Sequence, residues 1–516
     1  MPPRGLAIFG RGWPMTATVP AVTDRPRARA ATETAFVALV LGILADVLFR
    51  DASLGLSAPI WIGALIAALL YTGRHRETSA SPVELACLAL SFAAAAALAW
   101  RASEALQALL FLASGAFLVL AVAIRSGLPW RRTGVALFLG AMIAAGIAIA
   151  AGVYRVQSSL ELRNHALRRS KEGAGTIARI LVIGVPVVLV FAALFASADA
   201  VFEDRLVGLV GFDLSPVAQH LFWLVAGGWF AGGVTWASFE GGLVDVPEPS
   251  LPEARRLKSS EVATILGALA VLFAAFVAVQ LRYLFGGHEV VQDTLGLTYA
   301  EYARSGFFEL ATAAVLLLPL LLVADWARRH GGRADVIYRA LAGVLVTLLF
   351  VVMASALQRM RVYEEAYGLT EDRLYVVAIL VGLAAVFAFF LRTLIVARND
   401  WFVAGSIGAA AVVLGVLTAI GPDAVIAERN IERASVEHPF DAEYAARLGA
   451  DAAPVLVRHL DELSPADAAI VACSLLEEWG SGSGDGLRSW NWSRAEAADA
   501  VERASEELER ACDEGP

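Results

Sequence analysis

The sequence predicts an all-α protein, in which a polytopic transmembrane helical bundle is followed by a small helical C-terminal domain. Of the 516 residues, 58% are hydrophobic and the mean hydropathy is +0.64, whereas soluble domains are about 45–50% apolar. The apolar residues gather in blocks close to the roughly 20 residues that a helix needs to cross a bilayer. Because a bilayer offers no water to exposed backbone groups, each crossing should be helical. After residue 420 the blocks end and the chain becomes acidic.

The chain divides into three parts. Residues 1–34 contain several prolines and predict a flexible N-terminal tail, and residues 35–420 carry the apolar blocks. We place the spans at residues 35–50, 55–72, 82–100, 104–124, 133–153, 177–197, 217–239, 261–285, 306–327, 335–357, 373–397 and 401–420. The third and fourth are separated at Arg101–Glu104, because charges at the centre of one spanning helix are costly. The count is twelve, or eleven if the first block does not cross.

The positive charges predict the orientation. Cytoplasmic loops carry excess Lys and Arg, and the linkers that follow the fifth, seventh and ninth spans are basic. That face should be cytoplasmic, which places the C-terminal domain outside the cytoplasm. The N-terminal arginines disagree with this count. Either the first block is re-entrant, or the N-terminal tail lies outside. The composition is typical of a GC-rich bacterial genome, so we expect a multi-pass protein of the bacterial inner membrane.

Residues 421–516 predict a small helical domain. Pro465–Trp479 has apolar residues at helical spacing, and a Gly/Ser loop follows at residues 480–486. Ser493 and Glu496 fit a capping box at the start of a last helix. Cys473 and Cys512 could pair if the domain lies in an oxidising compartment.

Composition and motifs exclude several functions. The net charge of −9 argues against nucleic acid as a partner, because phosphate binding needs a basic stripe. No phosphate loop, nucleophile elbow or His-based metal motif occurs, so no cofactor and no metal is predicted. The glycines at 227, 228, 232 and 233 indicate close helix packing within a span.

Charged residues gather on one face when the spans are counted. Arginines follow the eighth and tenth spans and precede the ninth and eleventh, all on the extracytoplasmic side, where acidic residues also lie. The candidate ligand-binding residues are Asp199, Arg282, Tyr283, Tyr302, Arg304, Glu309, Arg359, Arg361 and Arg373. Arginine forks suit carboxylate or phosphate. A structural interpretation stays equally open, in which salt bridges join the spans and the tyrosines form an interfacial belt.

Several stretches together resemble a known family. They are residues 195–202, 280–287, 296–310, 367–370, 430–433 and 441–456. They resemble the bacterial membrane proteins grouped as domain of unknown function 4173, from about residue 191 to the end. This resemblance implies a polytopic inner-membrane protein and no assigned activity.

The favoured function is therefore non-enzymatic: binding or moving a ligand through an extracytoplasmic polar pocket. Besides the lipid bilayer, the partner would be an anionic small molecule or a lipid head group. One alternative is a membrane-embedded transferase for a lipid-linked substrate, with Glu301 or Glu309 as general base. Another is an assembly or sensory scaffold whose C-terminal domain binds a protein partner.

Overall fold

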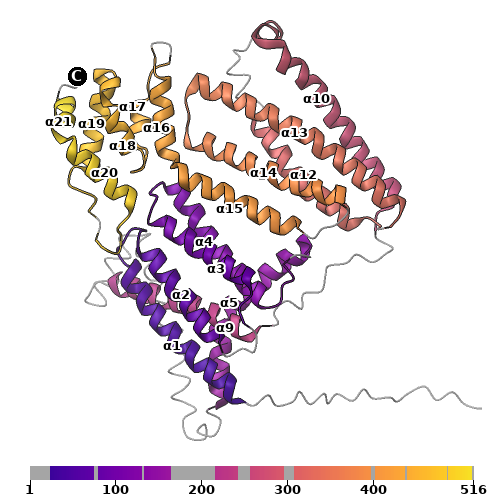
Figure 1. Ribbon diagram of the computed structural model, residues 1–516, viewed down its shortest axis with the longest axis vertical. Coiled ribbons are helices and arrows are strands. Elements are labelled where there is room, and N and C mark those ends of the chain that lie inside the picture. Colours follow the sequence, from indigo (N-terminus) through magenta and orange to yellow (C-terminus); the bar gives the residue numbers. More distant parts are fainter. Residues whose placement is uncertain are drawn as a thin grey trace, which may run out of the picture.

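A computed structural model shows a helical protein without strands among the residues that it describes (Figure 1). These are residues 24–74, 79–130, 133–163, 215–241, 256–295, 307–329, 331–396, 401–435, 438–484 and 486–513. Eight of the described helices are long and apolar enough to cross a membrane, and two shorter apolar helices accompany them. The all-α transmembrane fold class is confirmed.

The helices form two membrane bundles and a C-terminal domain. The first bundle contains α1 (Asp24–Phe49), α2 (Ser57–Gly73), α3 (Pro82–Leu98), α4 (Glu104–Arg125), α5 (Val135–Arg163) and α9 (Ser215–Glu240). The second contains α10 (Ser259–Leu295), α12 (Phe307–Ala327), α13 (Arg333–Tyr367), α14 (Glu371–Val396) and α15 (Phe402–Ile420). Every predicted span coincides with one of these helices, apart from 177–197, which lies outside the described residues. The predicted break at Arg101 is confirmed, whereas the first helix begins at Asp24, inside the predicted flexible tail.

Glycines bring the helices of the first bundle together. A Cβ added to Gly42 of α1 would lie 2.5 Å from the carbonyl oxygen of Leu224 in α9, and one added to Gly233 would lie 2.0 Å from that of Ile149 in α5. Only glycine permits such backbone approach. The prediction that the glycines of residues 227–233 serve packing is confirmed. In α2, the Trp61 indole also donates to the Leu41 carbonyl oxygen at 3.0 Å.

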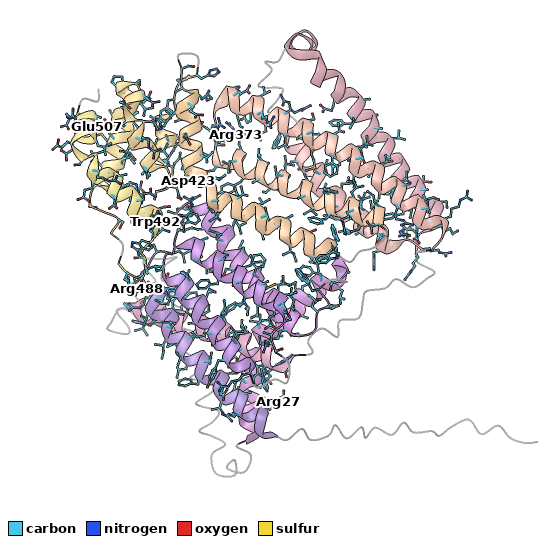
Figure 2. The ribbon with its side chains drawn as sticks, viewed as in Figure 1. Arg27, Arg373, Asp423, Arg488, Trp492 and Glu507 are labelled. Carbon is cyan, nitrogen blue, oxygen red and sulfur yellow. A yellow bond between two sulfur atoms is a disulfide. The ribbon has the colours of Figure 1, made fainter. Side chains whose placement is uncertain are left out.

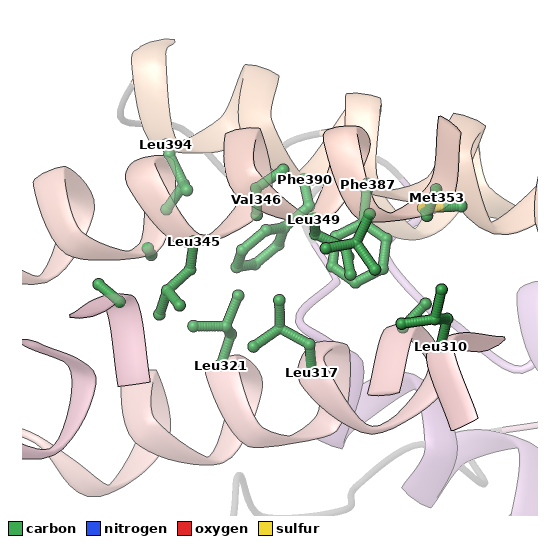
Figure 3. Close-up of a cluster of buried hydrophobic side chains, with 14 of the residues drawn as sticks. Leu310, Leu317, Leu321, Leu345, Val346, Leu349, Met353, Phe387, Phe390 and Leu394 are labelled. Carbon is green, nitrogen blue, oxygen red and sulfur yellow. The ribbon is translucent and has the colours of Figure 1, made fainter. Parts of the chain in front are cut away.

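The core of the second bundle is a layer of branched and aromatic side chains. Leu317 and Leu321 of α12 face Leu345 and Leu349 of α13, with Phe387 of α14 completing the layer (Figure 3). All of them are nearly or fully buried. Many large apolar side chains on the outer surfaces are instead exposed, such as Leu112, Ile143 and Val271. That combination is expected of helices whose outer surface faces lipid.

The two bundles meet along α4 and α15. Leu106 and Leu110 of α4 share a buried cluster with Leu417 of α15, and Tyr375 of α14 packs against the same cluster. The membrane part therefore has a continuous apolar contact between bundles that are distant in sequence.

The C-terminal domain begins directly after α15. It contains α16 (Pro422–Arg433), α17 (Ala442–Ala446), α18 (Ala453–Arg458), a 3₁₀ turn (Leu460–Glu462), α19 (Pro465–Trp479), α20 (Trp492–Arg503) and α21 (Ser505–Asp513). A disulfide between Cys473 and Cys512 joins α19 to α21. The predicted capping box at Ser493 is wrong. The side chain of Asn491 caps α20 by accepting from the Arg494 amide, and Ser493 is used elsewhere.

The helix ends define two faces. At the domain end, α1, α3, α13 and α15 stop beside the C-terminal domain, whereas α10 begins and α12 ends at the opposite end (Figure 1). Lys258 directly precedes α10 and Arg328 directly follows α12. Glu240 accepts from Arg27 at 2.9 Å and from Arg155 at 2.6 Å. The start of α1 and the end of α5 are therefore neighbours, at the opposite end. The side on which the N-terminal tail lies stays a prediction.

Candidate functional site

A buried polar junction connects the domain end of both bundles to the C-terminal domain. We use this name for six residues: Arg101, Ser103, Glu371, Asp423, Asp451 and Ser493. Arg101, in the α3–α4 loop, donates from Nη1 to Asp451 Oδ1 at 2.9 Å. Its Nε and Nη2 donate to the carbonyl oxygens of Thr418 and Ala419, at 2.7 and 2.8 Å, at the end of α15. One guanidinium thus holds three segments together.

Asp451 is the acceptor at the centre of this junction. Its Oδ2 accepts from the backbone N–H groups of Ala102 and Ser103, at 3.0 and 3.3 Å. Its Oδ1 accepts from the Ser493 hydroxyl at 2.6 Å. The Asp451 side chain is 1% exposed and that of Arg101 14%. A charge this deeply buried is tolerated because it is both paired and hydrogen-bonded.

Asp423 is a second buried acid, in the first turn of α16. It is 1% exposed, and its Oδ2 accepts from the Gly449 amide at 3.2 Å. Its Oδ1 is buried and has no hydrogen-bond partner among the described residues, while Glu371 and Ser103 lie near the carboxyl group. Burial, then the charge of Glu371 and then that of Asp451, raise the pKa of Asp423 to about 7. Asp423 can therefore hold a proton near neutral pH.

The α13–α14 turn is clamped to α16 beside the junction. Asn430 accepts from the Leu369 amide at 2.7 Å and donates to its carbonyl oxygen at 2.9 Å. Gly368 has φ +78°, and a Cβ there would lie 2.8 Å from Asn430 Oδ1. The Tyr444 hydroxyl accepts from the Glu371 amide at 3.0 Å. The turn is thus fixed by the domain and by a glycine that no larger residue replaces without strain.

Two arginines lie next to this turn, Arg373 and Arg433. Arg373 donates to the carbonyl oxygens of Tyr367, at 3.2 Å, and Gly368, and stacks over the Tyr363 ring at 4.1 Å. Arg433 donates to the Ala366 carbonyl oxygen at 3.4 Å, and its Nε is buried without a partner. Within the described part of the chain, neither forms an ion pair. Burial, and then the charge of Arg373, lower the pKa of Arg433.

The structure brings some of the predicted ligand residues to this place. Arg361 is exposed, and it interacts electrostatically with Glu364, as do Arg373 and Arg429. Arg359 instead faces α10, where it donates to Gln280 Oε1 at 2.9 Å. We call Arg361, Arg373, Arg429 and Arg433 the arginine cluster.

Other predicted residues are placed apart or lie beyond the description. Glu309 is exposed in the first turn of α12. Arg282 and Tyr283 belong to α10, but their side chains lie outside the described part, as do residues 199, 302 and 304 altogether.

Sequence reasoning missed the polar junction. Arg101 was considered only as a helix break, although Asn430, Arg433 and Asp451 lie in stretches that carried the family resemblance. One signal could have pointed to Asn430 and Arg433: both lie in the first helix after the last span. The pairing of Arg101 with Asp451 was not visible, because the two residues are separated by 350 positions.

An apolar groove lies away from the polar junction and the arginine cluster. The groove, of about 420 Å³, lies between α2 and α3, lined by residues such as Gly63, Leu85 and Phe92. Among the described residues, no group of three His, Cys, Asp or Glu side chains could hold a metal ion.

Comparison with known families assigns the chain. A family model described as domain of unknown function (DUF4153) matches residues 85–459. The chain belongs to this family. The number differs from that of the resemblance found in the sequence, and the match begins earlier and ends sooner than we expected. DUF4153 names a domain without assigned function, so this multi-pass integral membrane protein has no assigned activity. No curated protein and no solved structure matches it.

Proposed function

We propose that this protein binds an anionic ligand, through a phosphate or carboxylate group, at the arginine cluster on the domain end. The observation that carries the proposal is the pair of Arg373 and Arg433. Both guanidiniums donate to backbone carbonyl oxygens in one turn, and neither has an ion-pair partner among the described residues.

The electrostatics favour an anion there. Adjacent like charges disfavour each other's charged forms, which is the direction in which Arg373 shifts the pKa of Arg433. A bound anion would relieve this repulsion. Guanidinium groups bind phosphate and carboxylate through planar, two-pronged hydrogen bonds. The Nε of Arg433 is buried and has no hydrogen-bond partner among the described residues.

The position of the cluster supports an extracytoplasmic ligand. The Cys473–Cys512 disulfide supports an oxidising compartment for the C-terminal domain, because disulfides are rare in the cytoplasm. Arg27, Lys258 and Arg328 lie at the opposite end, which the positive-inside rule makes cytoplasmic. We therefore propose a bacterial inner-membrane protein with its C-terminal domain outside the cytoplasm.

The proposed binding residues differ in part from those predicted from the sequence. Arg361 and Arg373 stay in it, while Arg429 and Arg433 join from α16. Arg359 is held by Gln280, so it lies at the border towards α10.

Thermal unfolding of the detergent-solubilised protein with added inorganic phosphate tests the proposal. At one hundred times its dissociation constant, a ligand adds about 2.7 kcal/mol to the free energy of unfolding. We expect R433Q to lose this stabilisation and R433K to keep part of it. R503Q is the matched control, because Arg503 is exposed in α20 and its Nε donates within its own helix. Equal stabilisation of R433Q and the unchanged protein by phosphate would refute the proposal.

The buried polar junction bears on the scaffold alternative. A domain that only displayed a binding surface would need no more than a tether to the membrane, whereas Arg101, Asp451 and Asn430 connect this domain to both bundles.

For the transferase alternative, Glu309 is exposed in α12 and Glu301 lies outside the described residues. Because the domain is connected to both bundles, we favour ligand binding by the domain and the bundles together.

A further inference from the structure

The segment Leu487–Trp492, which we call the tryptophan segment, lies against the domain end of the first bundle. The Leu56 amide donates to the Trp490 carbonyl oxygen at 3.0 Å, and the Ser57 amide to that of Arg488 at 2.9 Å. The Trp492 amide in turn donates to the Ala99 carbonyl oxygen at 2.8 Å. The segment thus bridges the α1–α2 loop and the end of α3 (Figure 2).

Side chains and a glycine fix the segment in this place. Arg488 donates to the Val47 carbonyl oxygen at 2.5 Å, at the end of α1. Asn491, which is fully buried, donates to the carbonyl oxygens of Leu98 and Arg101 at 2.9 and 3.0 Å. A Cβ added to Gly55 would lie 2.3 Å from the Ser489 carbonyl oxygen. The depth of the segment relative to α1, α2 and α3 is therefore set by the fold.

Its large apolar side chains nevertheless point outward. Leu487 is 82% exposed and Trp492 54%, and the rings of Trp490 and Trp492 meet edge to face at 6.2 Å. Trp100, at the end of α3, is exposed beside them. The indole N–H of Trp492 donates to Glu496 Oε2 at 3.1 Å. The exposed ring surface and the Leu487 side chain, on a backbone held by this many hydrogen bonds, form an apolar patch that indicates a partner outside the domain.

The adjoining spans identify that partner. The candidate span Arg29–Phe49 ends next to Val47, whose carbonyl oxygen binds Arg488. The segment therefore lies at the level where the hydrocarbon core meets the head groups. Tryptophan is enriched at this level, because its ring is apolar and its N–H polar. Arg488 and Arg494 add positive charge that suits anionic head groups.

We propose that the tryptophan segment is a membrane anchor, in which Leu487 and Trp492 insert into the outer lipid interface beside α1 and α3. The anchor holds the C-terminal domain against the bilayer surface. It does not depend on the arginine cluster, which lies on the side of α13 and α14.

Depth-dependent fluorescence quenching tests the anchor. L487C and I470C are made separately in a C87S background, labelled with an environment-sensitive fluorophore, and placed one per lipid nanodisc. Ile470 is the matched control, because it is exposed on α19, a helix that packs into the core of the C-terminal domain. Spin-labelled phospholipids carry the nitroxide either on the head group or near the end of the acyl chain.

We expect the label at position 487 to shift to shorter wavelength and to lose emission with the head-group nitroxide, while the label at position 470 keeps its emission. Equal quenching at the two positions would overturn the proposal. A shift to shorter wavelength without any quenching would also overturn it, because the label would then be covered by protein rather than lipid.

Discussion

Breaking the buried ion pair between Arg101 and Asp451 should destabilise the attachment of the C-terminal domain. D451L leaves the Arg101 guanidinium, the amides of Ala102 and Ser103 and the Ser493 hydroxyl without their acceptor. Removing one partner of a buried pair costs about 3–5 kcal/mol, because the other charge stays buried. We expect about 4 kcal/mol for D451L. R101M should cost about 3 kcal/mol, because Asp451 keeps its other donors.

A double-mutant cycle separates the pair from its surroundings. Removing both charges leaves no buried unpaired charge, so the double variant should be about 2 kcal/mol more stable than the sum of the single effects predicts. The assay is urea unfolding in detergent, followed by tryptophan fluorescence. The control cycle is R429M with E432L, a pair with the same charges at 3.3 Å but with 69% and 59% exposed side chains. Its coupling should be under about 1 kcal/mol. Equal coupling in the two cycles would refute the reasoning.

Three further predictions concern the domain and its turn. Replacing Cys473 and Cys512 by serine should lower the free energy of unfolding by about 4 kcal/mol in the absence of reductant, because the disulfide closes a loop with a sequence separation of 39; no loss on urea unfolding would contradict this. G368A should cost about 2 kcal/mol through its positive φ and displace Asn430, whereas G482A, at φ +85° in open space, reports the backbone strain alone; equal effects in the same assay would exclude the Asn430 contact. For Asp423, whose pKa is raised from 3.8 to about 7, the folded state binds the proton more tightly than the unfolded chain. Stability should therefore fall as the pH rises from about 4 to about 7 and then level off. D423N should reduce that slope, and an unchanged slope would assign it to other groups.

The membrane fold was predictable because the bilayer imposes one length and one backbone structure on each span. The blocks between residues 35 and 420 therefore located the described helices, including the break at Arg101. The contact between the start of α1 and the end of α5 was not predictable, because the residues that make it are distant in sequence. The shared contacts of Glu240 with Arg27 and Arg155 reveal it.

The candidate site was less predictable than the fold. Counting spans placed Arg361 and Arg373 on one face, but it could not tell that Arg359 faces Gln280. The partners of Arg101 and the position of Arg433 depend on contacts between segments that are distant in sequence. The cap at Asn491 was missed because Ser493 and Glu496 matched a local pattern, while Asp451 binds the Ser493 hydroxyl. Tertiary hydrogen bonds decided these positions.

The most direct test of anion binding is an experimental structure of the protein in nanodiscs, determined by electron cryomicroscopy in phosphate buffer. The account predicts density between the guanidiniums of Arg373 and Arg433, within hydrogen-bonding distance of both, and its loss in R433Q. A structure in which each guanidinium instead pairs with a carboxylate of the protein, with no density between them, would contradict it.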